Sequence, residues 1–242
     1  MWKEPNQIQA VQVKARVESV TLAPRAVPEP ARPSFHLAGS RADERARYTI
    51  ERMGKPYDGI TPELAEWIER QHLFFVATAP LATDGLINCS PKGMDTFRIL
   101  APREVAYLDL TGSGIETIAH ARENGRIVFM FCEFDGAPKI VRLHGTAEAH
   151  VFGSPQYDSL SALFPTLVGS RAIVRARLTR ISDSCGFAVP QFNYRGERQT
   201  LTRWAESKGD DGLAQYRHTK NHRSLDGLPG LPARTPLLDD VE

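Results

Sequence analysis

Two short segments of the sequence carry the residue types from which proteins build anion-binding sites. Residues 108–126 (LDLTGSGIETIAHARENGR) run from a strand-like pattern through Thr-Gly-Ser-Gly into a helix-like pattern. The first N–H groups of a helix have no partner within it and carry a partial positive charge, so such a turn can hold a phosphate. The second segment, residues 88–93 (NCSPKG), offers the Ser90 hydroxyl and the Lys92 ammonium to the same kind of ligand.

Each segment also has a purely structural interpretation. With Ser113 as the N-cap, Glu116 stands at the third helical position, and the two side chains would form a capping box. Asn124 and Gly125 would then end this helix in a left-handed turn. Residues 88–93 contain a proline and a glycine, which are common in solvent-facing turns. The local pattern therefore leaves both interpretations open.

Other polar residues give weaker signals. Arg142 stands in an apolar strand-like run, where an arginine must either face solvent or find an anion. His218 and His222 have the spacing of a zinc pair on a helix, but no third ligand accompanies them, so we predict no metal site. The odd number and wide spacing of the cysteines argue against a disulfide framework and predict reduced, mostly buried thiols at Cys89, Cys132 and Cys185.

The composition is that of a globular chain with nearly balanced charges. The 242 residues are 41% hydrophobic and 24% charged, and the formal net charge is +1. Such a balance provides no electrostatic reason to expect nucleic acid or an anionic membrane as a partner. No apolar run approaches the roughly 18 residues of a membrane span, and the N-terminus lacks the pattern of a secretory signal. We therefore expect a cytoplasmic protein, with organelle targeting by residues 1–52 left open.

We expect three parts along the chain. Residues 1–52 contain the proline-rich run APRAVPEPARPSF and a strand-like alternation at residues 11–17 that has no neighbouring strand to pair with. This composition predicts an N-terminal extension that is largely disordered. Residues 53–231 hold the patterned core, and the proline-punctuated residues 232–242 form a tail.

Hydrophobic alternation predicts a mainly β core with a few helices. A helix is expected over residues 61–71, with Thr61 as its N-cap and Pro62 at its first position. The C-terminal third predicts two short helices that are broken near residues 209–212. Several short strand-like runs separated by turns favour an antiparallel barrel or sandwich, and these runs cover residues 73–79, 85–90, 96–100, 104–110, 126–134, 139–151 and 172–181.

Taken together, these pieces resemble a known family. The combination of QHLFFVATAP, DGLINCSPKG, VAYLDLTGSGIETIAHARENGRI and KIVRLHGTAE is similar to the pyridoxamine 5′-phosphate oxidase-like flavoproteins, in particular to a branch that bears SPKG and DLTGSG. The likeness covers about residues 53–231, and its motifs are specific in combination and weak singly. The resemblance implies an antiparallel split β-barrel with helices, of the FMN-binding type, and a homodimer with the flavin at its interface.

The resemblance also implies a set of FMN-binding residues. In the family, the flavin phosphate is held at the end of the second strand, at the strand-to-helix turn and in the first turn of the following helix, and a later strand contacts the flavin. Carried over by position, these residues are Ser90, Lys92, Asp109, Leu110, Thr111, Ser113, Thr117 and Arg142. The resemblance implies a small-molecule substrate of unknown identity and assigns no catalytic residue.

The sequence departs from the pyridoxamine phosphate oxidases proper at two places. Those enzymes carry an Arg-Lys pair after the serine of the strand-to-helix turn, where this chain has Gly114 and Ile115. Their C-terminal arginine-and-tryptophan motif for pyridoxal phosphate is also missing here. We therefore expect an FMN-dependent oxidoreductase that acts on another substrate. Two alternatives remain open: a non-enzymatic FMN store or sensor, and a flavin-free dimeric interaction module. A deazaflavin or haem in place of FMN would be a variant of the enzyme hypothesis.

Overall fold

The computed structural model describes residues 54 and 56–232 of the chain, and these belong to one compact unit. The predicted extension over residues 1–52, with its strand-like segment at residues 11–17, lies outside the described residues. So does the predicted tail beyond residue 232. Within the described residues, no helix is both long and apolar enough to cross a membrane.

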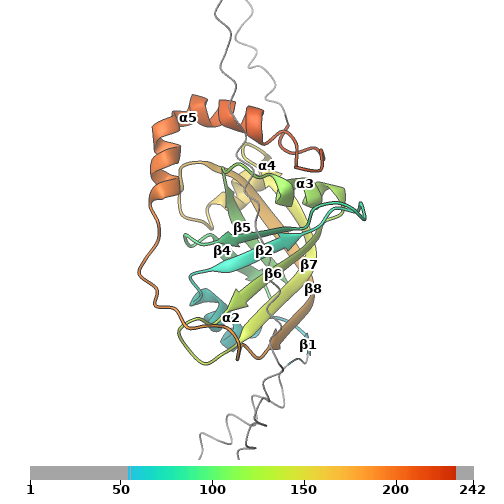
Figure 1. Cartoon of the computed structure of the whole chain (residues 1–242), viewed down its shortest axis with the longest axis vertical. Helices are drawn as coiled ribbons and strands as arrows, with labels where there is room; N and C mark the ends of the chain where they lie inside the picture. The colour runs from blue at the N-terminus through green and yellow to red at the C-terminus, as the bar shows by residue number, and fades with distance from the viewer. Residues whose placement is uncertain (1–53, 55, 233–242) are drawn as a thin grey trace, which may run out of the picture. The chain divides into compact units, whose positions relative to one another are not determined.

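One antiparallel sheet dominates the described part of the chain (Figure 1). Its strands follow the order β3-β2-β6-β7-β8-β5-β4, and the short β1 pairs with β8. The strands are β1 (Pro56–Tyr57), β2 (Phe74–Thr78), β3 (Asn88–Lys92), β4 (Phe97–Ala101), β5 (Glu104–Leu110), β6 (Arg126–Cys132), β7 (Ile140–Val151) and β8 (Ser170–Ser184). The helices are α2 (Pro62–Glu69), α3 (Glu116–Glu123), α4 (Pro155–Ser161) and α5 (Thr200–Lys220).

The sheet curls around an aromatic core. Phe97 of β4 lies 5.5 Å from Phe129 and 5.0 Å from Phe131, measured between ring centroids, although β4 and β6 are not neighbours in the sheet. The two edge strands, β3 and β4, therefore approach each other across a barrel that remains split between them. Inward residues of the other strands, such as Val76 and Leu143, are fully buried in the same core. The predicted antiparallel split barrel with helices is confirmed.

The helices cover the two ends of this barrel, with α2 at one end and α3 and α5 at the other (Figure 1). The predicted start of α2 is confirmed, because Thr61 Oγ1 accepts a hydrogen bond from the Leu64 N–H at 3.3 Å and Pro62 opens the helix. The predicted break in the C-terminal helix is also confirmed. It lies at Gly209, whose φ of 61° and ψ of 178° suit glycine alone.

Three expectations need correction or addition. The prediction of mostly buried thiols is wrong, because only Cys132 is buried. Cys89 is exposed because alternation along β3 turns it to the outer face of the sheet, and Cys185 follows directly after the end of β8. The sequence patterns also missed the two-residue β1 and the helix α4, whose N-cap is Ser154. The seven predicted strands are all present, and β5 has the predicted bounds.

Candidate functional site

A cavity of about 330 Å³ lies where β3, the end of β5 and the start of α3 meet. Five of the residues predicted for a phosphate site line it: Ser90, Lys92, Leu110, Thr111 and Thr117. The two segments singled out in the sequence, residues 88–93 and 111–117, therefore form opposite sides of one cavity. Further lining comes from residues that were not predicted as cofactor ligands, among them Asn88, Met94, Thr96, Leu108, Glu116, Arg171 and Leu201.

Alternation along β3 places its polar side chains together. Asn88, Ser90 and Lys92 pair with Thr78, Val76 and Phe74 of β2, which are the core-facing residues of that strand. The three β3 side chains therefore share the inner side of the sheet at its open edge, next to β5. Asn88 was missed as a candidate, although its spacing of two from Ser90 and four from Lys92 was a usable signal.

Asp109 lies beneath the cavity as a buried anion between two cations. Its carboxylate is fully buried and lies 2.7 Å from Arg171 Nε and 3.1 Å from Lys92 Nζ. Burial acts to raise the pKa of Asp109, but the charges and hydrogen bonds of Arg171 and Lys92 outweigh it and hold that pKa below its ordinary value. Since one carboxylate balances only one of two cations, the group keeps a net positive charge next to the cavity.

The C-terminal part of the chain holds the strand-to-helix turn from behind. Asn221, which is fully buried, donates its amide to the Gly112 carbonyl at 2.9 Å, and Arg171 donates to the same carbonyl at 3.2 Å. Arg217 of α5 donates to Thr111 Oγ1 at 2.8 Å. A carbonyl and the N–H of the next residue point in opposite directions in a trans peptide. Fixing the Gly112 carbonyl towards Asn221 therefore turns the Ser113 N–H away from it.

The backbone of this turn leaves a run of donors without acceptors. Among the described residues, the N–H groups of residues 112–118 have no hydrogen-bond acceptor, and no side chain caps α3. Gly112, Gly114, Glu116 and Thr117 of this run line the cavity. Unpaired N–H groups at the start of a helix carry a partial positive charge and bind anions.

The predicted capping box of α3 is wrong. The helix begins at Glu116, the cap position falls on Ile115, and the Ser113 side chain makes no cap. The Glu116 carboxylate instead accepts a hydrogen bond from the distant Leu225 N–H at 3.2 Å. The other end of α3 follows the prediction, because Gly125 adopts a left-handed conformation with a φ of 72°.

Two of the predicted cofactor residues lie away from the cavity. Ser113 is exposed and is not part of the lining. Arg142 projects from the outer face of β7, where its guanidinium donates to Ser184 Oγ at 2.8 Å. Both assignments remain predictions from the resemblance. His218 and His222 are exposed, and the described residues contain no cluster of three or more metal-ligating side chains.

A hydrogen-bonded chain leads from the cavity into the core. The Asn88 amide donates to Thr117 Oγ1 at 3.0 Å and to Thr78 Oγ1 at 3.1 Å. Thr78 Oγ1 in turn lies 2.9 Å from Nδ1 of the fully buried His120. The Thr78 hydroxyl accepts from Asn88 and can donate to Nδ1, which assigns the imidazole proton to Nε2, a buried nitrogen without a hydrogen-bond partner among the described residues. Burial lowers the pKa of His120, so the ring is neutral.

The residues that complete the site come from distant parts of the sequence. Arg171 stands 62 positions after Asp109, and Asn221 stands 109 positions after Gly112. An aspartate within an apolar strand signals that a cation must be nearby, but no local pattern identifies which one. Arg171, Arg217 and Asn221 were therefore missed, since only the folded topology brings them to the turn.

Comparison with known proteins identifies the family. A family model described as pyridoxamine 5′-phosphate oxidase matches residues 60–185. A curated relative, the pyridoxamine 5′-phosphate oxidase family protein ustO of Aspergillus flavus, is 40% identical over 192 residues, which cover 72% of this chain and 77% of the relative.

Solved structures with a similar outline include two bacterial proteins. HupZ of Group A Streptococcus is 25% identical, with a TM-score of 0.39, and the match covers 50% of this chain and 91% of that one. A protein of Lactobacillus delbrueckii, described as a putative pyridoxamine 5′-phosphate oxidase, is 18% identical, with a TM-score of 0.41 and coverage of 52% and 98%. The family model spans the barrel strands from β2 to β8, and the curated relative extends the match well beyond half of the chain. The chain belongs to the pyridoxamine 5′-phosphate oxidase family.

Proposed function

We propose that this chain binds FMN, with the flavin phosphate in the 330 Å³ cavity, and that it is an FMN-dependent oxidoreductase acting on a small molecule. The observation that carries the proposal is the run of N–H groups at residues 112–118 that have no acceptor among the described residues. These donors stand beside Lys92 and Arg171 on the cavity wall. This donor set suits a phosphate better than any neutral group.

The charges around the cavity support an anionic ligand. Lys92, Arg171 and Arg217 contribute three positive charges, and Asp109 and Glu116 contribute two negative charges, which leaves a net charge of +1. We infer that Arg171 on the cavity wall, and Arg217 behind it on Thr111, provide positive charge near the turn where the pyridoxamine phosphate oxidases proper carry an Arg-Lys pair.

Ile115 stands where the pyridoxamine phosphate oxidases proper have the lysine of the Arg-Lys pair, and it has a different role in this chain. Ile115 is 1% exposed and packs with Ile118 and Ala172 in the core. The side chain that replaces a cation therefore serves packing, while two arginines from β8 and α5 supply the charge.

The chain's own groups would orient and neutralise the phosphate. The Asn88 amide occupies an acceptor site of Thr117 Oγ1, which leaves the hydroxyl proton of Thr117 available to donate into the cavity. Lys92 and Arg171 would balance the phosphate charge from the β3 and β8 sides. The flavin ring, when bound, would supply the redox chemistry, so a catalytic triad is not required.

The proposal is tested by comparing FMN with riboflavin, which has the same ring but no phosphate. The full chain is purified, its visible spectrum is recorded, and any released cofactor is identified by mass. We expect the apoprotein to bind FMN at least about tenfold more tightly than riboflavin, because the charged hydrogen bonds to the phosphate are lost with riboflavin. A colourless protein that does not take up added FMN would rule out the flavin assignment.

Substitution of Lys92 tests whether the flavin phosphate lies in this cavity. Lys92→Met keeps an apolar side chain beside Asp109, which retains Arg171 as its counterion. We expect FMN affinity to fall about tenfold while riboflavin affinity stays unchanged. Lys208→Met, at an exposed position of α5, is the matched control. Equal losses for both ligands, or no loss for either, would place the phosphate elsewhere.

A reduction assay distinguishes an FMN-dependent oxidoreductase from a non-enzymatic FMN store. FMN-loaded protein is mixed without oxygen with reduced nicotinamides, with pyridoxine phosphates and with simple reductants, and the flavin absorbance is followed. Bleaching by one of these donors supports the oxidoreductase. Tight FMN binding with no reduction by any of them would favour the non-enzymatic store.

A further inference from the structure

The turn that joins β3 to β4, residues 93–96, crosses the opening of the split barrel. Three of its four residues, Gly93, Met94 and Thr96, line the 330 Å³ cavity. A second and larger cavity, of about 1230 Å³, lies next to α2, and residues 88–96 do not line it. The turn therefore belongs to the cavity in which we place the flavin phosphate.

The backbone of this turn has an unusual conformation. Met94 and Asp95 have φ values of 64° and 54°, and among the described residues they are the non-glycine residues with a positive φ. Contact between Cβ and the backbone makes this left-handed region costly for residues other than glycine, asparagine and aspartate. On backbone grounds alone, methionine is an unfavourable residue at position 94.

Strand pairing does not explain this conformation. Two successive left-handed residues form the turn that joins paired strands in a β-hairpin, where Asn-Gly is a common sequence. Here β3 and β4 are the two edge strands of the sheet, and they do not pair with each other. Left-handed residues that the fold does not require are concentrated at sites where a side chain contacts a ligand.

Neighbouring side chains hold the turn in place. Asp95 forms an ion pair with Arg98, whose Nη1 and Nη2 donate to the carboxylate at 2.8 and 3.1 Å. Thr96 Oγ1 donates to the Gly93 carbonyl at 2.7 Å. The backbone conformation of Met94 is therefore fixed by contacts that its own side chain does not make, which leaves this side chain free to serve the cavity.

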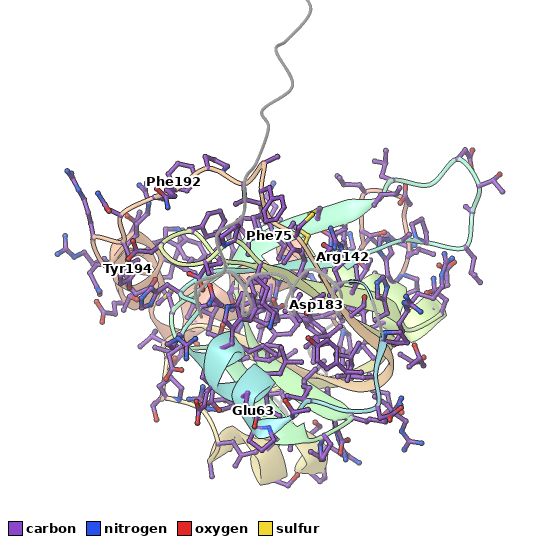
Figure 2. The ribbon with its side chains drawn as sticks, turned by 90° about the horizontal axis from the view of Figure 1, so that it is seen from below. Glu63, Phe75, Arg142, Asp183, Phe192 and Tyr194 are labelled. Carbon is purple, nitrogen blue, oxygen red and sulfur yellow. The ribbon has the colours of Figure 1, made fainter. Side chains whose placement is uncertain are left out.

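The extended segment before α5 packs against the other side of the turn. Tyr194, which Figure 2 shows with Phe192 on this segment, stacks on His72 with a centroid distance of 3.6 Å and donates to Glu197 at 3.0 Å. A Cβ atom built on Gly93 would lie 3.2 Å from the His72 carbonyl oxygen and 3.4 Å from a Glu197 carboxylate oxygen. The turn therefore has little room to move away from the cavity.

Met94 lies at the end of the cavity away from the proposed phosphate. β3 begins at Asn88, whose amide donates to Thr117 in the first turn of α3 at 3.0 Å. The strand ends at Lys92, two residues before Met94. A ligand whose phosphate binds to the N–H groups of residues 112–118 would therefore extend along β3 towards Met94.

We propose that Met94 contacts the flavin ring and selects a ligand with a flat aromatic group at this end of the cavity. The inference rests on the proposed FMN site. The thioether of methionine is polarizable and flexible, and it packs favourably against aromatic rings. This contact would offset the backbone cost that glycine would avoid at this position. Met94 then determines the affinity for the ring, whereas Lys92 determines the affinity for the phosphate.

The first test follows the Met94 side chain directly. The full chain is labelled with [methyl-¹³C]methionine, and the Met94 signal is identified by its absence from the spectrum of Met94→Leu. We expect saturating FMN and saturating riboflavin to shift this signal through the ring current, because both ligands contain the flavin ring. Inorganic phosphate, which would occupy only the turn before α3, should leave the signal unshifted.

Substitution of Met94 separates a ring contact from structural support. Met94→Gly removes the thioether, so we expect the affinities for FMN and for riboflavin to fall by the same factor, about fivefold. The urea midpoint of the apoprotein should not fall, because glycine relieves the left-handed backbone. Met94→Leu, which keeps an apolar side chain of similar size, should retain most of the affinity for both ligands.

Asp95→Asn is the matched control for the turn. Asparagine also tolerates the left-handed conformation, and the side chain at this position is exposed and does not line the cavity. This variant should bind FMN and riboflavin as the wild type does.

Three outcomes would overturn the proposal while the FMN site stands. These are wild-type FMN affinity in Met94→Gly, an unshifted Met94 signal at saturating FMN, and a lower urea midpoint for the Met94→Gly apoprotein, which would assign the side chain to packing of the barrel. FMN uptake by the wild type is measured first. A wild type that takes up neither FMN nor riboflavin would refute the proposed flavin function, and this inference with it.

Discussion

At the scale of single residues, the buried imidazole of His120 has a fixed protonation state. Its Nδ1 faces the Thr78 hydroxyl, and its Nε2 has no hydrogen-bond partner among the described residues. Protonation of Nδ1 would create a buried charge. It would also place the new N–H donor opposite the Thr78 hydroxyl, which then could no longer donate to this nitrogen. Burial therefore lowers the pKa of His120, against the opposing charges of Asp226 and two glutamates.

The pH dependence of stability follows from this residue. As the pH falls below about 6.5, the unfolded chain takes up a proton at His120 that the folded chain does not, so the free energy of unfolding falls. Between about pH 7.5 and about pH 5.5, we expect the free energy of unfolding to fall more for wild type than for His120→Gln. Urea denaturation at both pH values measures this. His218→Gln, at an exposed histidine, should match wild type, and parallel curves for wild type and His120→Gln would contradict the prediction.

At the scale of elements, the first cavity depends on contact between the end of α5 and the turn before α3. Asn221 follows α5, and its amide group joins the Gly112 carbonyl to the Arg171 guanidinium. Leu225 and Gly230 continue this contact by bonding Glu116 and Arg122 of α3. The C-terminal region thus decides where α3 begins, which the local sequence pattern could not indicate.

Removal of the Asn221 amide tests this contact. Asn221→Ala leaves the Gly112 carbonyl and the Arg171 guanidinium each without one partner, so we expect a loss of about 1–3 kcal/mol in the free energy of unfolding. The adjacent Thr111 N–H, which donates to the Gly169 carbonyl at 2.8 Å, should also exchange faster with solvent. His222→Ala, at the exposed neighbouring position, is the control. A variant as stable as wild type would show that the turn holds its shape alone.

At the scale of the whole molecule, the outer face of the sheet carries an apolar patch on β2, β3 and β6. Phe75 of β2 lies in register between Pro91 of β3 and Met130 of β6, and all three point away from the core. Phe75 and Met130 are half-buried, and Pro91 is exposed. We propose that a second copy of the chain covers this face in a homodimer, as the family resemblance implies.

A charge on this face should separate the two copies. We expect wild type to elute with about twice the 26.9 kDa of one chain in size-exclusion chromatography with light scattering. Phe75→Glu should shift the mass to that of one chain, because its neighbours in register, Pro91 and Met130, provide no counterion, and a buried unpaired carboxylate costs several kcal/mol. Leu225→Glu, at a residue that is 78% exposed, should keep the wild-type mass. A monomeric wild type would refute the dimer.

The sequence predicted the strands more accurately than the sites. Alternation is a local property, so β5 was predicted with its observed bounds, whereas Ser90 and Lys92 were assigned to the phosphate by the family resemblance. The start of α3 was wrong because Leu225 binds the Glu116 carboxylate that a capping box requires. The second cavity could not be foreseen, since its wall joins residues from Tyr57 to Arg195 without a shared pattern.

The extended segment between β8 and α5 borders both cavities. Arg195 lines a cavity of about 1230 Å³ next to α2, and Leu201, six positions later, lines the 330 Å³ cavity, so their Cα atoms are at most about 22 Å apart. If a ligand in one cavity orders this segment, the conformational freedom of the segment beside the other cavity changes, and such coupling must be reciprocal. Titrating one cavity with the other saturated would therefore measure a single coupling free energy, with the same value in either order of addition.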